Sequence, residues 1–281
     1  MLSRKIGIDL GSATVRVFVK GEGIVLNEPA LVAPDGDGTM ALHRLIGRAR
    51  GRPRLFKPEV IVSVPSAVTA TERRAVTEAA MSAGARQVWL IDEPLAAAMG
   101  AGLAIGELRA SAICEIGAST TEIAVISLSG TVSSASIPVG GRSLDGAIAA
   151  GLNISEHAAE ETKIAVGSAV VMETPLVTTV AGLEVSSNDI ARLVEKPLEA
   201  ISGAIRKVLA ETPREHAEVL SERGIVLSGG GAQLRGLATF IAKRAGIPAV
   251  VADEPQTSVV RGTGLALDHF EVLRRNQSYL R

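Results

Sequence analysis

Two glycine-containing turns in this sequence have the residue types that bind phosphate groups. In the first, "IGIDLGSATVRVFV" (residues 6–19), Asp9 and Gly11 lie in a turn of small residues between two alternating apolar runs. Because glycine carries no side chain, the backbone N–H groups of such a turn can approach an anion closely. A carboxylate just before the glycine can bind a hydrated cation, most naturally the Mg²⁺ that accompanies phosphates. The alternative is a simple hairpin turn, in which small residues are favoured for steric reasons.

The second turn repeats the pattern of the first. "AICEIGASTTEIAVI" (residues 112–126) aligns with the first segment at an offset of 106 residues, so that Glu115 matches Asp9 and Gly117 matches Gly11. An internal repeat of this kind predicts two homologous lobes, each of which begins with the same hairpin. Two such hairpins would bind a polyphosphate between the lobes, whereas chance similarity of two glycine turns is the competing explanation.

A third glycine turn occurs in "LSGGGAQLRGL" (residues 227–237). Three consecutive glycines between a strand and a helix allow the backbone to lie against a flat ligand, or to present helix N-terminal N–H groups to an anion. A tight strand–helix connection explains the motif equally well. The lysine and the spacing of a Walker loop are absent.

Glu93 is a candidate for acid–base chemistry. It lies in "DEP" (residues 92–94), where a predicted strand ends and a helix begins. A carboxylate at the C-terminal edge of a strand, facing a phosphate site, can position an attacking water. The alternative is an acid at a helix start, which the helix dipole favours.

Alternating strand and helix patterns predict the elements that position these motifs. Thr69 and Glu72 form a capping box, and Gly84 suits the C-terminal end of the helix that follows. This alternation is typical of an α/β protein with helices on the faces of its sheet. We expect a loop from about residue 34 to Pro58. The expected strands cover residues 5–10, 15–20, 23–33, 59–65, 87–94, a pair within 112–126, a hairpin within 174–186, a strand before 229, and 249–255; the expected helices cover 70–83, 95–102, a stretch near 143–170, about 188–211, a helix after 233, and 258–275.

Composition excludes several classes of function. Hydrophobic residues make up 47% of the 281 positions, which is enough for one large domain or two lobes. A net charge of −1 and 2% aromatic residues disfavour a nucleic-acid partner. The single cysteine excludes a disulfide framework, and the first residues contain no apolar signal core. We therefore expect a cytoplasmic protein.

A basic segment, "RLIGRARGRPRLFKP" (residues 44–58), contains six cations and no acid. Leu55 and Phe56 lie inside this cluster. A basic patch is attracted to anionic headgroups, and two apolar side chains add burial, which suits reversible peripheral attachment to a membrane. The alternative is a solvated loop whose Leu55 and Phe56 pack into the core.

These motifs together resemble MreB-type bacterial actin homologues of the actin/Hsp70/sugar-kinase superfamily. The resemblance runs in family order through the two hairpins, "VIVSVPSAVTATERRAVTEAAMSAGARQVWLIDEPLAAAMGAGL", "IPVGG", "ETKIAVGSA", "ERGIVLSGGGAQLRGL" and "GIPAVVADEPQTSVVRGTGLAL". It implies an actin-like ATPase fold in which two duplicated ribonuclease-H-like lobes surround a nucleotide cleft. The first lobe would cover residues 1–109, with the C-terminal helix 259–281 returning to it, and the second lobe residues 110–258.

The resemblance also implies ligands and roles. ATP and Mg²⁺ would bind, and the protein would work at the inner face of the cell membrane in cell shape or cell-wall synthesis, with other MreB-type subunits or itself and with morphogenesis proteins as partners. Glu93 matches the acid that orients the hydrolytic water, with Thr120 or Thr121 assisting, and Leu55 and Phe56 match a membrane-inserting pair. The implied nucleotide-binding residues are Asp9, Gly11, Ser12, Ala13, Thr14, Gly117, Ala118, Ser119, Thr120, Glu160, Lys163, Gly230, Gly231, Ala232 and Gln233, and the implied metal ligands are Asp9 and Glu115.

The second phosphate turn departs from the family pattern. Glu115 replaces an aspartate and is one methylene longer, while Ala118 and Ser119 replace glycines. Nucleotide binding tolerates such changes better than hydrolysis does, because small misplacements of reacting groups are costly. We therefore expect at most a weak ATPase.

Two segments of the family are also shortened, one between residues 33 and 55 and one between residues 169 and 187. They correspond to outer subdomains that supply longitudinal filament contacts, and a smaller contact falls below the size of a stable interface. An alternative function follows, namely a nucleotide-binding scaffold that neither hydrolyses ATP nor polymerises by itself and acts through partner proteins. A small-molecule kinase or phosphatase of the superfamily is a third reading, but it would need a substrate-binding insertion.

Overall fold

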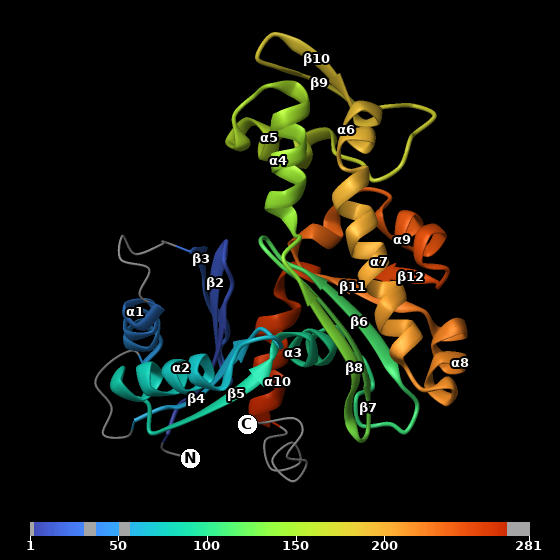
Figure 1. The fold of residues 1–281 in the computed structure, drawn as a ribbon. Helices are drawn as coiled ribbons and strands as arrows, with labels where there is room; N and C mark the ends of the chain where they lie inside the picture. Colours follow the sequence, from blue (N-terminus) through green and yellow to red (C-terminus); the bar gives the residue numbers. More distant parts are fainter. Residues whose placement is uncertain (1–2, 31–37, 51–56, 269–281) are drawn as a thin grey trace. The chain divides into compact units, whose positions relative to one another are not determined.

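A computed structural model describes residues 3–30, 38–50 and 57–268 of the chain. Its contacts divide the chain into two compact units. The first comprises Met1–Leu108, Ile126–Val132 and Gln256–Arg281, and the second comprises Arg109–Val125 and Ser133–Pro255. Each unit contains a five-stranded sheet with helices packed against it, so the predicted α/β class is confirmed (Figure 1).

The sheet of the first unit has the strand order β3-β2-β1-β4-β5. Strands β1, β2 and β3 form an antiparallel meander, and β4 and β5 run parallel to β1. The C-terminal ends of the three parallel strands therefore lie at one edge of the sheet, which is where ligands bind in open α/β sheets. The strands are β1 (Lys5–Leu10), β2 (Thr14–Val19), β3 (Gly23–Pro29), β4 (Glu59–Val64) and β5 (Gln87–Asp92), close to the predicted ranges.

Helices α3 (Glu93–Gly100) and α10 (Ser258–Asp268) pack tightly against each other on this sheet. A Cβ atom at Gly100 would lie 1.8 Å from the Ser258 carbonyl oxygen, and one at Gly262 would lie 1.8 Å from the Ala96 carbonyl oxygen. Helix α10 also contacts β1, β2 and β4. The two helix backbones approach so closely because both contact positions are glycine.

Helix α2 (Ala70–Ser82) begins where the sequence predicts. The Thr69 side chain accepts from the backbone N–H of Glu72, and the Glu72 carboxylate accepts from the backbone N–H of Thr69. Gly84, just beyond the helix, has a φ of +97°. The predicted capping box and the predicted glycine end are therefore both confirmed.

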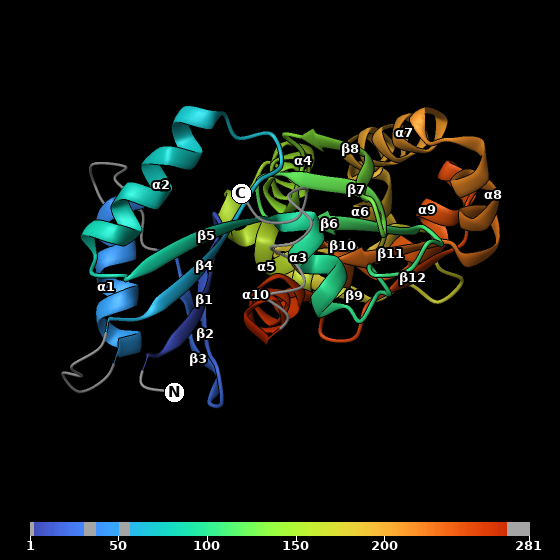
Figure 2. The same cartoon turned by 90° about the horizontal axis from the view of Figure 1, so that it is seen from below.

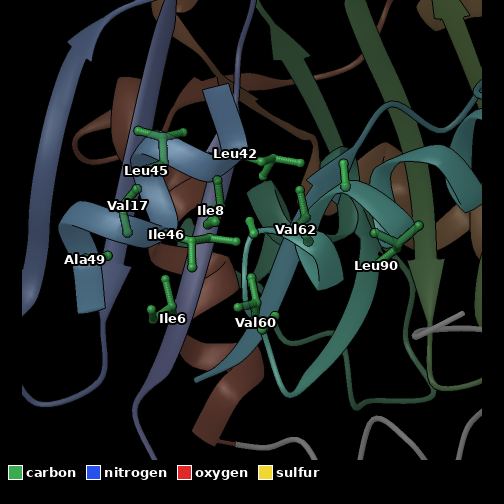
Figure 3. Packing of buried hydrophobic residues seen from close by; sticks show 14 of the residues in the cluster. Ile6, Ile8, Val17, Leu42, Leu45, Ile46, Ala49, Val60, Val62 and Leu90 are labelled. Carbon is green, nitrogen blue, oxygen red and sulfur yellow. The ribbon is translucent and has the colours of Figure 1, made fainter. Parts of the chain in front are cut away.

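The expectation of a loop up to Pro58 is wrong, because residues Gly38–Arg50 form helix α1. Leu42, Leu45, Ile46 and Ala49 recur at the spacing of one helix face and are buried against β1, β2 and β4 (Figure 3). The glycines and arginines of the segment suggested a loop, but this apolar spacing decides the structure. Together with α2, helix α1 covers the face of the sheet opposite α10 (Figure 2).

The sheet of the second unit has the order β12-β11-β6-β7-β8. Strands β11 and β12 run parallel to each other and to β6. Strand by strand this order matches β5-β4-β1-β2-β3 of the first unit, so the two hairpins of the sequence repeat occupy equivalent places in their own sheets. The strands are β6 (Ser111–Ile116), β7 (Thr121–Ser127), β8 (Gly130–Ile137), β11 (Ile225–Ser228) and β12 (Ala249–Val251).

Two predicted long helices of the second unit are each divided. The stretch near 143–170 breaks at Asn153, whose φ of +55° caps the first helix, and Ser155 caps the next. The helix expected over 188–211 breaks at Val194, because the ring of Pro197 clashes with a continuing helix at Leu193. The resulting helices are α4 (Gly141–Leu152), α5 (Glu156–Val166), α6 (Ser187–Leu193) and α7 (Glu195–Glu211).

The remaining elements of the second unit include one that the sequence analysis missed, helix α8 (Arg214–Arg223). The predicted hairpin forms as β9 (Val177–Val180) and β10 (Leu183–Ser186). Figure 1 shows this hairpin next to α5 and α6, beyond the end of the five-stranded sheet. Helix α9 (Leu237–Ala245) follows the third glycine turn and packs on α7 and β12.

Candidate functional site

The turn between β1 and β2 is shaped by Gly11. A Cβ atom at this position would lie 2.7 Å from the Thr14 carbonyl oxygen and 3.8 Å from Oδ1 of Asp9. The first distance is too short for any side chain, so the turn requires glycine. Ser12 and Ala13 are exposed at its tip. The turn thus presents backbone and small side chains to solvent, as a phosphate-binding turn does.

Asp9 is buried directly behind this turn, at 5% exposure. The register of the hairpin pairs it with Arg16, whose Nη1 donates to Asp9 Oδ2 at 3.3 Å. Burial raises the pKa of Asp9 to about 6, although the Arg16 guanidinium acts in the opposite direction. The sequence analysis did not identify Arg16 as a site residue.

Glu93 lies at the same edge of the first sheet as this turn, because it follows β5, which is parallel to β1 through β4. Its neighbour Asp92 is engaged elsewhere, since its Oδ1 accepts from Nη2 of Arg73 at 2.6 Å. Glu93 is partly buried in the first turn of α3. The position agrees with both interpretations of Glu93, a helix-start acid and a carboxylate at a ligand-binding edge.

The turn between β6 and β7 is closed by its own backbone. The Gly117 N–H donates to the Thr120 carbonyl at 2.9 Å. The first residues of α4 pack on this turn, since the N–H groups of Gly141 and Arg142 donate to the carbonyls of Gly117 and Ala118. The helix can begin this close to the turn because Gly140 has no side chain. A Cβ atom at this position would lie only 2.7 Å from the Gly117 carbonyl oxygen.

Arg142 adds a cation to this second turn. Its Nη1 donates to Oγ of Ser119 at 3.2 Å. Ser119 is one of the residues that replace family glycines, so its hydroxyl here orients an exposed guanidinium beside the turn. An arginine in this place suits phosphate recognition.

The third glycine turn lies beside the second one. Glu115 on β6 pairs with Ser228 on β11, so both turns leave the same edge of the sheet. A Cβ atom at Gly229 would lie 2.5 Å from Oε1 of Glu115, and one at Gly231 would lie 2.4 Å from Cγ2 of Ile116. Glycine is therefore required for the two turns to pack together. Residues Gly230–Gln233 form a 3₁₀ helix in which Gly230 and Gln233 are exposed and Ala232 is buried.

Lys163 of α5 reaches the start of α4. Its Nζ lies 2.6 Å from Oδ1 of Asp145 and donates to the Gly141 carbonyl at 3.4 Å. Burial raises the pKa of Asp145, and the Lys163 ammonium opposes that rise. Glu160, one turn before Lys163, is exposed. The second unit thus gathers its two glycine turns and Lys163, as the resemblance implies, and adds Asp145, which the sequence analysis missed.

The two candidate threonines differ in their surroundings. Thr121 is fully buried, and its hydroxyl donates to the Val139 carbonyl at 2.7 Å. Because that hydroxyl has one proton, it has none left to donate to a water molecule. Thr120 is partly exposed in the turn itself. Thr120 is therefore the better candidate for assisting chemistry.

The predicted metal ligands fit a divalent cation unequally. Mg²⁺ requires oxygen ligands in near-octahedral geometry and retains several waters. Asp9 does not fit, since a buried guanidinium already engages its carboxylate. Glu115 lies against the glycine turns and fits better. Across residues 3–30, 38–50 and 57–268, no group of three or more His, Cys, Asp or Glu residues is arranged to hold a metal ion.

The predicted membrane segment is described only in part. Leu55 and Phe56 lie outside the described residues. Arg44 and Arg48 are on the exposed face of α1, where Arg48 Nη1 pairs with Oε2 of Glu28 at 2.6 Å. In the described part of the chain, every helix is too short or too polar to cross a bilayer.

Comparisons with known proteins agree with this architecture. The sequence profile of a family described as MreB/Mbl protein matches residues 3–43 and 38–275. Cell shape-determining protein MreB of Escherichia coli (strain K12) is 37% identical over 331 aligned positions, which cover 97% of this chain and 95% of that protein. Crystal structures of Spiroplasma citri MreB5 bound to ADP and to AMPPNP superpose with TM-scores of 0.88 and 0.87 at 26% identity, each covering 98% of this chain and 99% of the other.

The fold defined by these matches is that of the bacterial actin-like proteins. The chain belongs to the MreB/Mbl family. The alignment with the Escherichia coli protein spans 331 positions although this chain has 281 residues, so that protein contains segments with no counterpart here. The family match falls into two parts that overlap at residues 38–43, at the start of α1, within the segment that the sequence analysis expects to be shortened.

Proposed function

We propose that this protein is an ATP-binding, MreB-type cytoskeletal protein that acts in cell shape or cell-wall synthesis at the inner face of the membrane. Membership of the MreB/Mbl family supports the proposal. The relative at 37% identity is named a cell shape-determining protein, and MreB5 has been crystallised with ADP and with AMPPNP.

The observation that carries nucleotide binding is the packing of the second and third glycine turns at one sheet edge. Backbone N–H groups of residues 118–120 contact the phosphates. The resemblance assigns the same role to the turn from Gly11 to Thr14. Glu160 and Lys163 bind the nucleoside side. Gly230, Gly231 and Gln233 supply the surface for the adenosine, with the buried Ala232 holding the turn in place.

Hydrolysis, where it occurs, is slow. Glu93 orients the attacking water and Thr120 assists it. Mg²⁺ neutralises phosphate charge when bound, and Glu115 is the protein carboxylate suited to it. Glu115 is one methylene longer than the aspartate of the family pattern, and Ala118 and Ser119 add Cβ atoms to the phosphate turn. These changes displace the reacting groups from their best geometry.

Titration of the purified full chain with ATP tests this proposal. Replacing Lys163 with methionine removes a positive charge that is held in place by Asp145, and weakens ATP binding by about tenfold. Lys207→Met is a matched control, since Lys207 is an exposed lysine on α7. Absence of ATP binding by the parent protein, or equal affinities for the two variants, contradicts the proposal. Phosphate release measured on the same samples distinguishes slow hydrolysis from none.

The alternative, a scaffold that binds nucleotide without hydrolysis or autonomous polymerisation, is favoured by the segments that the Escherichia coli relative contains and this chain lacks. A smaller outer subdomain reduces the contact area available between subunits. Electron microscopy of the protein with ATP separates the two candidates. Long homopolymers support a filament-forming protein, and their absence supports a partner-dependent one.

Membrane attachment is tested separately with vesicles of anionic lipid. A double variant, Leu55→Ala with Phe56→Ala, removes the apolar pair while leaving the basic residues in place. We expect its co-sedimentation to fall several-fold relative to the parent, because burial of two apolar side chains is lost. Equal co-sedimentation excludes a membrane role for this pair.

A further inference from the structure

Arg16 is a buried cation beside the carboxylate that the family resemblance assigns to a metal ion. The side chains of Arg16 and Asp9 are 11% and 7% exposed, and Nη1 of the arginine lies 3.3 Å from Oδ2 of the aspartate. Both residues come from the hairpin itself, where they are direct cross-strand partners. The ion pair is therefore built into the same hairpin as the first glycine turn.

This ion pair lies close to the turn that would receive phosphate. A Cβ atom at Gly11 would lie 3.8 Å from Oδ1 of Asp9. Nε of Arg16 is buried without a hydrogen-bond partner among the described residues. A buried donor that remains unsatisfied calls for an explanation, and a site that is completed by an anionic ligand provides one.

The arrangement disagrees with a magnesium ion at Asp9. One carboxylate oxygen already accepts a hydrogen bond from the guanidinium, and a positive charge this close repels a divalent cation. Arginine remains charged at every physiological pH, so the repulsion is permanent.

We propose that Arg16 replaces a divalent cation at the first turn, so that ATP binds this protein with little dependence on Mg²⁺. The inference rests on the ATP binding proposed above. Paired with Arg16, Asp9 presents no net charge to the phosphates, and metal-free ATP is accepted. An unpaired Asp9 would repel metal-free ATP and would favour the magnesium complex.

The test is a double-mutant cycle on the full chain, with ATP affinity measured by calorimetry in Mg²⁺ and in EDTA. The measured quantity is the ratio of the dissociation constant in EDTA to that in Mg²⁺. The affinities are compared at about pH 9, well above the raised pKa of Asp9, so that its carboxylate is ionised in each variant that retains it. For the parent protein we expect a ratio below about threefold, and for Arg16→Met an increase of about tenfold or more, because the charge of Asp9 is then uncompensated. Asp9→Asn keeps the ratio low, and adding it to Arg16→Met restores the low ratio.

Arg86→Met is the matched control. Arg86 also pairs with a carboxylate in the first unit, Glu59, but at the start of β4, at the opposite end of the strands from the turn. The ratio of dissociation constants measured for Arg86→Met should equal that of the parent protein. A role of Arg16 in structure alone would weaken both affinities equally and leave the ratio unchanged.

Each outcome either supports or overturns the proposal that Arg16 replaces a divalent cation. A high ratio in the parent protein, or an unchanged ratio in Arg16→Met, overturns the inference while leaving ATP binding intact. If Arg16→Met does not fold, the ratios of the parent and of Asp9→Asn decide, since both must be low. Absence of ATP binding in Mg²⁺ as well as in EDTA overturns the proposed function and this inference with it.

Discussion

The two repeated hairpins share a backbone but differ in charge. In the first hairpin Asp9 is paired with Arg16, and at the offset of the repeat the second hairpin has Glu115 and Glu122. Glu122 is fully buried, and its Oε1 accepts from Oγ of Ser136 at 2.5 Å. The first hairpin thus contains its own cation, whereas the second contains two acids.

The second unit supplies cations to its turn from helices instead. Arg142 of α4 contacts Ser119, and Lys163 of α5 contacts Gly141 and Asp145. An arginine fixed within a hairpin is held by the sheet, while a side chain on a helix moves with that helix. The comparison teaches that duplicated glycine turns can differ in how charged side chains surround them without a change in strand order.

Breaking the pair in the first hairpin should produce the largest effect on stability. Arg16→Met leaves Asp9 buried without its partner, and removing one member of a buried ion pair costs about 3–5 kcal/mol. We expect the free energy of unfolding in urea at neutral pH to fall by that amount.

The matched change in the second hairpin is Glu122→Gln, which retains an acceptor for Ser136. It should cost about 1 kcal/mol. If both variants lose the same free energy, the difference in charge between the hairpins has no consequence for stability.

The pH dependence of stability provides a second comparison. The pKa of Asp9 is raised to about 6 in the folded protein, so its protonated form is favoured by folding. Its contribution is complete below the unfolded pKa of about 3.9 and is lost as the pH rises through 6, by up to about 3 kcal/mol. Asp9→Asn removes this loss.

The measurement is the free energy of unfolding of Asp9→Asn minus that of the parent, followed between pH 4 and pH 7. We expect the difference to shift in favour of Asp9→Asn as the pH rises. Glu78→Gln is the control, since its side chain is exposed on α2 of the same unit. A difference that does not change with pH shows that Asp9 titrates normally.

Much of the fold could be predicted from the sequence, because its signals are local. Alternation of apolar residues defined the strands, and the capping box at Thr69 defined a helix start. Helix α1 was missed although its apolar residues recur at helical spacing, because glycine, proline and arginine dominate the composition of the segment. The break at Val194 could have been predicted from Pro197.

The site could be predicted as a set of turns but not as a set of charges. Gly11 and Gly229 are required because a Cβ atom at either position would collide with backbone, and such glycines are visible in sequence motifs. The pairing of Asp9 with Arg16 depends on hairpin register, and that of Lys163 with Asp145 depends on how α4 and α5 pack. Register could have been inferred once the turn at Gly11 was placed, since cross-strand partners then follow by counting. Helix packing could not, because it is a tertiary property.

The smallest expected effect concerns Arg142, the cation that α4 adds to the second turn. Arg142 is exposed, so its charge is screened, and Arg142→Gln should weaken ATP binding only about three- to fivefold. Calorimetry at low and at high salt checks this, because a screened contact contributes less as salt is added, whereas the contribution of buried Arg16 persists. Arg214→Gln, a change at an exposed arginine on α8, is the control. A loss that remains unchanged at high salt would show that Arg142 becomes buried against the phosphates when ATP binds. Both turns would then have a buried arginine, and they would differ only in whether that arginine comes from the hairpin or from a helix.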